Sequence, residues 1–264
     1  ENKGTALSLG ERETTGNEAT LEISDSVITE FGVAVFSSGP VRLLRNNLIT
    51  KNRIQAIDCT AKAGEAVLLK NNNTISGNRA GIRAPGGKVE LLHDNLIEDN
   101  GGFAVFAEDI LLGERNTIQK NEKGLRAVNA IHLKKENKVL DNGGDGAEAV
   151  RIIVGDGNSI SGNEGVGLAV TAPHNGKGTA SRLELGDFNL VLDNAKDGLY
   201  CSTSGPIVLG NDNQVLRNDF SDNPGAGSGI KSQLGSIHLG NGNMVKQNGQ
   251  CGILAPRGKV VMGE

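Results

Sequence analysis

Two acidic residues stand where catalytic carboxylates could lie. Asp145 and Asp197 each directly precede a glycine, and a pair of carboxylates is what general acid–base cleavage of a glycosidic bond requires. The same Asp-Gly dipeptide is also an ordinary turn. Asp145 and Asp197 are therefore weak catalytic candidates, with a structural turn as the competing interpretation.

A second set of residues capable of chemistry, mostly basic and aromatic, recurs along the chain. It contains four cations, one carboxylate, the single Tyr and one of the six Phe: Asp58, Arg83, Phe106, Arg126, Arg151, Tyr200 and Lys231. Cations pair with anionic groups, and aromatic rings stack on other flat surfaces. On one face of a fold, these side chains would suit an anionic or stacked sugar chain. Alternatively, they are ordinary outward residues of strands.

Neither a metal nor a cofactor is indicated. Gly143-Gly144-Asp145-Gly146 matches a calcium-binding repeat only in its glycines and occurs once. The three cysteines have neither the spacing of a zinc site nor the density of a disulfide scaffold. We expect Cys59, Cys201 and Cys251 to be small core residues.

The composition limits both the fold and the partners. The 264 residues carry a net charge of -4 without a basic run, so we expect no nucleic-acid partner. No apolar run is long enough for a membrane span. With 38 Gly, 28 Asn and no Trp, a core built on aromatic anchors is excluded, although 37% hydrophobic residues suffice for folding.

An internal repeat organises the chain. The hexamer Asn-x-(Ile/Val)-x-x-Asn occurs nine times, from Asn47–Asn52 to Asn243–Asn248. The repeating unit is about 21 residues long, and some units carry insertions. Each hexamer (segment B) is preceded by a short alternating segment A, such as Ile131-His132-Leu133. It is followed by a segment C of the form Gly-(Ile/Leu)-x, such as Gly124-Leu125-Arg126.

Three short strands in about 21 residues leave no room for a helix. The repeat therefore predicts an all-β parallel β-helix of about 10–11 coils with three short parallel sheets. The central position of segment B is Ile or Val in all nine copies, which predicts an internal column. The Asn columns can pass hydrogen bonds from coil to coil, because an amide both donates and accepts.

These Asn-x-Ile-x-x-Asn and Gly-Ile patterns resemble the right-handed parallel β-helix repeat proteins of the pectin-lyase-like superfamily. The resemblance implies that a polysaccharide would lie along the outward face of segment C, where Asp58 to Lys231 would form one strip. We expect the insertions at 171–179 and 219–227 to wall that face. The sequence departs from the polygalacturonase-like members, since it has no Gly-His-Gly motif.

The sequence predicts one β-helix domain over 1–264, with a decayed first coil at 1–24 and the start of a further coil at 260–264. Such ends suggest part of a longer array or end-to-end self-association. We expect a non-catalytic extracellular or surface module, acting as a rigid spacer or as a rod that binds a polysaccharide or cell-surface glycan. The alternative is a lyase or glycoside hydrolase acting on an acidic glycan.

Overall fold

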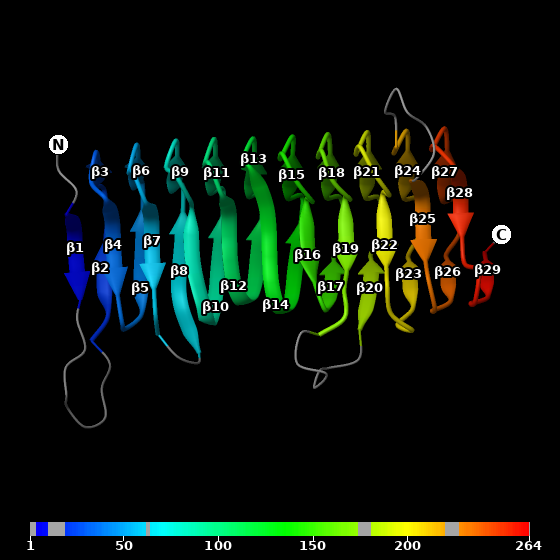
Figure 1. Cartoon of the computed structure of the whole chain (residues 1–264), viewed down its shortest axis with the longest axis horizontal. Coiled ribbons are helices and arrows are strands. Elements are labelled where there is room, and N and C mark those ends of the chain that lie inside the picture. The colour runs from blue at the N-terminus through cyan, green and yellow to red at the C-terminus, as the bar shows by residue number, and fades with distance from the viewer. Residues whose placement is uncertain (1–3, 10–18, 62–63, 174–180, 220–226, 264) are drawn as a thin grey trace.

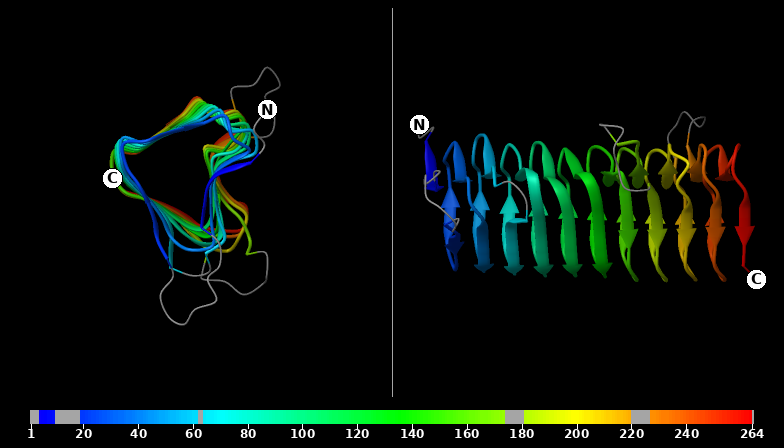
Figure 2. Two further views of the ribbon diagram at one scale, coloured as in Figure 1. Left: turned by 90° about the vertical axis from the view of Figure 1, so that its left-hand side faces the viewer. Right: turned by 90° about the horizontal axis from the view of Figure 1, so that it is seen from below.

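A computed structural model describes residues 4–9, 19–61, 64–173, 181–219 and 227–263. Strands are the regular elements of this part of the chain, and they form a parallel solenoid in which each coil runs through segments C, A and B (Figure 1). The view down the axis shows a three-sided tube (Figure 2). Among these residues no helix is long and apolar enough to span a membrane.

Ladder C is the stack of segment C strands on adjacent coils. Its separate strands are β1 Thr5–Leu9, β4 Val33–Ser37, β7 Gln55–Cys59, β16 Ala147–Ala149, β19 Leu168–Val170, β22 Leu199–Cys201, β25 Ser228–Ser232 and β28 Cys251–Leu254. All pairings within it are parallel, from β1 on β4 to β25 on β28.

Ladder A follows ladder C around one corner of the tube. Its separate strands are β2 Leu21–Ile23, β5 Val41–Arg45, β8 Glu65–Asn71, β17 Arg151–Val154, β20 Arg182–Leu185, β23 Ile207–Leu209, β26 Ile237–Leu239 and β29 Val260–Met262. β29 pairs with β26, so residues 260–262 continue this ladder.

Ladder B carries the hexamers. Its strands are β3 Val27–Thr29, β6 Leu48–Thr50, β9 Thr74–Ser76, β11 Leu96–Glu98, β13 Thr117–Gln119, β15 Lys138–Leu140, β18 Ser159–Ser161, β21 Leu190–Leu192, β24 Gln214–Leu216 and β27 Met244–Lys246. They form one sheet of ten strands in the order in which they occur in the chain.

Ladders A and C are not separate sheets throughout, which differs from the three sheets expected. In three central coils one long strand covers both segments: β10 Ile82–His93, β12 Phe103–Glu114 and β14 Lys123–Lys135. Their pairing continues around the corner with a shift of register, for example between Ala84 and Lys88. The two ladders therefore belong to one hydrogen-bonded network of 19 strands.

The predicted internal column is confirmed. The central residues of ladder B stack directly on one another, as in Ile97 on Ile118 and Ile118 on Val139. From Ile49 to Val215 each member of the column is fully buried. Burying a β-branched side chain of this size contributes about 1.5–3 kcal/mol relative to exposure.

Both predicted Asn ladders are also present. In one, Asn47 begins a chain of side-chain hydrogen bonds that ends at Asn243; in the other, the chain runs from Asn52 to Asn248, with Nδ2 to Oδ1 distances of 2.8–3.2 Å in both. Each Oδ1 also accepts the backbone N–H of the preceding Asn, as between Asn121 and Asn142 at 3.1 Å.

The residue before each ladder Asn adopts a left-handed backbone. All eighteen have a φ of 52–68°, and only four of them are glycine. Arg115 and Phe188, for instance, have φ values of 54° and 59°. A left-handed conformation costs a non-glycine residue about 1–2 kcal/mol, so the hydrogen bonds of the following Asn must offset a repeated local cost.

Replacing Asn121 with Ala tests this. The variant removes the acceptor of the Asn100 N–H and Nδ2–H, which lie 3.2 and 2.9 Å from Asn121 Oδ1. Asn100 Nδ2 keeps its hydrogen bonds to the Ile75 and Glu98 carbonyls, whereas the buried Asn100 backbone N–H loses its acceptor. A buried donor left unpaired costs about 1–3 kcal/mol, so we expect Asn121→Ala to lower the free energy of unfolding by about that amount, measured by circular dichroism during urea unfolding. Asn129→Ala, which removes a peripheral bond to Glu108, is the control. Equal losses in the two variants would contradict a special role for the ladder.

Candidate functional site

The outward residues of ladder C form a continuous line, here called the strip. The strand register aligns Phe36, Asp58, Arg83, Phe106, Arg126, Glu148, Ala169, Tyr200, Lys231 and Leu254. Six of the seven residues predicted from the sequence thus lie on one face. Whether they bind a ligand remains a prediction.

Arg151 is the exception, and its predicted position was wrong. It lies in β17 of ladder A, where its neighbours on adjacent coils are Ala130 and Arg182. Glu148 takes its place on the strip, paired with Arg126. Gly146-Ala147-Glu148 has the same spacing as Gly124-Leu125-Arg126, but the small Ala147 makes its segment C weak.

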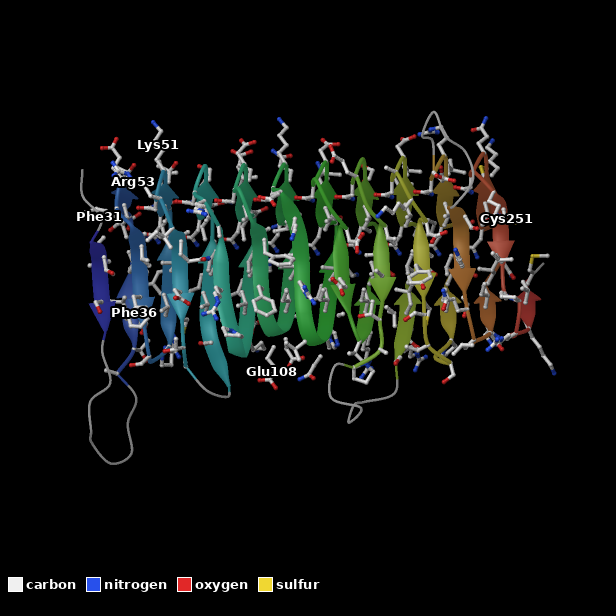
Figure 3. All side chains as sticks on the ribbon, viewed as in Figure 1. Phe31, Phe36, Lys51, Arg53, Glu108 and Cys251 are labelled. Atoms are coloured by element: carbon white, nitrogen blue, oxygen red, sulfur yellow. The ribbon has the colours of Figure 1, made fainter. Side chains whose placement is uncertain are left out.

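Sequence reasoning also missed aromatic and basic residues at and beside the strip. Phe36 extends the strip toward the N-terminus, and its ring lies on the outer side of β4 (Figure 3). Phe103 and Lys123 lie three residues before Phe106 and Arg126 and are themselves paired between coils. Counting back three positions from each strip residue would have found them.

Two groups of interacting side chains lie along the strip. Cluster 1 consists of Phe103, Phe106, Lys123, Arg126 and Glu148. The two Phe rings lie 5.9 Å apart between centroids. Lys123 Nζ and Arg126 Cζ lie over the Phe103 ring, at 5.1 and 5.7 Å from its centroid. Arg126 Nε is 3.7 Å from a carboxylate oxygen of Glu148. Rings, cations and an acceptor are thereby gathered on three consecutive coils.

A shallow pocket of about 70 Å³ adjoins cluster 1 at the corner between ladders C and A. It is lined by Phe106, Arg126, Ala127, Val128, Glu148, Val150, Thr171 and Ala172. The pocket is large enough only for one face or one substituent of a ligand lying along the strip.

Cluster 2 consists of Asp197, Tyr200 and Lys231. Lys231 Nζ lies 5.9 Å from the Tyr200 ring centroid and 3.9 Å from Asp197 Oδ2. Burial raises the pKa of Asp197 above its usual 3.8, an effect that the hydrogen bond from the Ser228 backbone N–H and the charge of Lys231 oppose. Burial and the nearby Asp197 likewise raise the pKa of Tyr200.

The two catalytic candidates occupy equivalent places with one coil between them. Asp145 Oδ1 accepts the Val166 backbone N–H at 2.7 Å, and Asp197 Oδ1 accepts that of Ser228 at 2.6 Å. Each carboxylate thus joins its coil to the next. Asp197 is the better placed for chemistry, because it also contacts Lys231 of cluster 2.

The predicted loops lie mainly outside the described residues, which omit 174–180 and 220–226. In the described part of the chain, no three His, Cys, Asp or Glu side chains gather as a metal site would require. Cys59 and Cys201 are buried, as expected, whereas Cys251 is only half-buried near the end of ladder C (Figure 3).

We compared the sequence and the structure with known protein families, proteins and solved structures. The family model described as a right-handed β-helix region matches residues 15–175, more than half of the chain. The chain belongs to this right-handed β-helix family. Neither a curated protein nor a solved structure matches it. The β-helix fold is therefore shown, while its ligand has to be argued from the strip itself.

The raised pKa of Asp197 predicts how this β-helix responds to pH. The folded state binds the Asp197 proton more tightly than the unfolded state does. The stability of the fold therefore decreases as pH rises above 3.8, the pKa of this carboxyl in the unfolded chain. Asn at this position can still accept the Ser228 N–H. We expect Asp197→Asn to raise the melting temperature at neutral pH, with the gain vanishing near about pH 3.

Asp94 supplies a control, because its pKa is shifted in the opposite direction to that of Asp197. Hydrogen bonds from Arg115 lower the pKa of Asp94, so its ionised form stabilises the fold above the unfolded pKa, and that contribution is lost on acidification. Asp94→Asn should therefore lower the melting temperature at neutral pH and change it little in acid. The same pH trend in both variants would contradict the assigned burial of Asp197.

Proposed function

We propose that this β-helix is a rigid extracellular or surface module that binds a polysaccharide lengthwise along the strip. The observation that carries the proposal is the recurrence of one arrangement in clusters 1 and 2. In each, an aromatic ring, a cation and a carboxylate lie together on two or three adjacent coils. Rings offer flat apolar faces, while charged groups bond to hydroxyls.

The shape of the solenoid supports an extended ligand. Coils repeat at roughly 4.8 Å, so the ladders of this protein extend over about 50 Å. A polymer lying across the strands would meet one strip residue on each coil. Polysaccharides of such length are found outside cells and at their surfaces, which is the reason for placing the function there.

Aromatic truncation tests the binding proposal. We expect Phe106→Ala and Tyr200→Ala each to weaken binding in a polysaccharide array by about tenfold, corresponding to a loss of roughly 1.4 kcal/mol. Phe188→Ala is the matched control, because Phe188 is 61% exposed but follows ladder A rather than ladder C. Binding that survives both strip variants, or no binding to any polysaccharide, would refute the proposal.

Asp197 supports one catalytic alternative. A buried carboxyl with a raised pKa beside a ligand face can serve as a general acid. The test is to incubate each polysaccharide that binds with the protein and to assay for new reducing or unsaturated ends. If such ends appear and Asp197→Asn abolishes them, the strip is a catalytic cleft, acting as a hydrolase or lyase.

A further inference from the structure

The corrected register changes the charge of ladder C. We count the charged residues of the strip together with those that lie three residues before a strip residue. Among these residues, cations and carboxylates are equal in number. The cations are Arg83, Lys123, Arg126 and Lys231, and the carboxylates are Asp58, Asp145, Glu148 and Asp197. With Arg151 replaced by Glu148, the excess of cations over carboxylates on the strip itself falls from three to one, and Lys123, Asp145 and Asp197 beside it bring the total to zero. The positive excess that would favour a polyanion is therefore lost.

Each cation of the strip itself also lies close to a carboxylate of a neighbouring coil. Arg83 Nη1 is 3.0 Å from Asp58 Oδ1. The corresponding distances are 3.7 Å between Arg126 and Glu148, and 3.9 Å between Lys231 and Asp197. The pairing is thus a property of the whole strip rather than of one coil.

An anionic ligand gains little from such pairs. A carboxylate arriving beside Arg126 would be attracted by the guanidinium and repelled by Glu148 at nearly the same distance, so the two Coulomb energies largely cancel. At an uncompensated cation the same contact would be favourable. The strip therefore discriminates against polyanions.

The same pairs suit a ligand with hydroxyl groups. A hydroxyl donates to a carboxylate and accepts from a guanidinium or ammonium, so neighbouring hydroxyls can bond to both members of one pair. The faces of Phe106 and Tyr200 can cover the C–H surface of a sugar ring. This combination of apolar faces and paired donors and acceptors matches uncharged carbohydrate.

We infer that the ligand is an uncharged, hydroxyl-rich glycan held at clusters 1 and 2 together; this rests on the proposed polysaccharide binding. Phe106 and Tyr200 are four coil steps apart in the register. At roughly 4.8 Å per coil, a ligand that reaches both must span about 19 Å. Occupying two linked sites raises affinity steeply once the chain is long enough.

The test uses calorimetry with defined oligosaccharides of increasing length, up to the octamer. Neutral β-1,4-linked and β-1,3-linked glucose and β-1,4-linked mannose oligomers are compared with galacturonate and guluronate oligomers. We expect at least one neutral octamer to bind, with a dissociation constant that changes less than about twofold between about 0.05 and 0.5 M NaCl. Its affinity should rise at least about tenfold over that of the trimer.

Glu148→Gln tests the charge compensation directly. The variant keeps the size of the side chain and a hydrogen-bonding oxygen but removes the charge beside Arg126. We expect uronate oligomers to gain at least about fivefold in affinity in low salt, an effect lost in high salt. Glu136→Gln makes the same charge change at the exposed corner between ladders A and B, and it should leave uronate binding unchanged.

Three results would overturn the inference. Uronates that bind wild type more tightly than any neutral oligomer, with affinity falling steeply in salt, would make the ligand acidic while leaving polysaccharide binding intact. A neutral trimer that binds as tightly as the octamer would exclude the two-cluster arrangement. No binding by any oligomer, together with no signal on the polysaccharide array, would remove the proposed function itself.

Discussion

The amide-to-amide hydrogen bond between adjacent coils is the interaction on which the rest of the structure depends. Each ladder Asn receives both the backbone and the side-chain N–H of the preceding Asn on a single oxygen, as Asn142 does from Asn121. Two such columns flank the strands of ladder B from β6 to β27. Because an Asn that slipped by one residue would leave buried donors unpaired, the columns fix the register of successive coils.

That register determines what each face presents. With coils aligned, β-branched residues of ladder B stack inside the tube, while side chains of ladder C stack outside it. Side chains far apart in sequence then meet at the spacing of neighbouring strands, which is how Arg126 comes to contact Phe103 and Glu148. The strip is thus a consequence of the Asn columns, although its side chains make no contribution to them.

Much of this could be predicted from the sequence, because an alternating pattern repeated nine times specifies both period and facing. The two Asn columns, the internal Ile and Val column and six strip residues follow from it. Glu148 was missed where its segment C is weak. A third column of side-chain-to-backbone bonds, linking Asp156, Asp187, Asn211 and Asn241, was missed as well. It covers only the C-terminal coils, and mixed Asp and Asn hide its repeat. Ion pairing and the burial of Asp197 depend on side-chain placement between coils, which no pattern along the chain specifies.

Hydrogen exchange of the Asn side-chain amides, followed by NMR spectroscopy, tests the central claim most directly. If the two columns hold the coils together, the Nδ2 protons of the central ladder residues, such as Asn100, Asn121 and Asn142, should exchange as slowly as the buried backbone amides of ladder B. The peripheral amide of Asn129 should exchange orders of magnitude faster. Ladder amides that exchange as fast as Asn129, while the backbone of ladder B stays protected, would show that strand pairing alone maintains the register and would contradict the account.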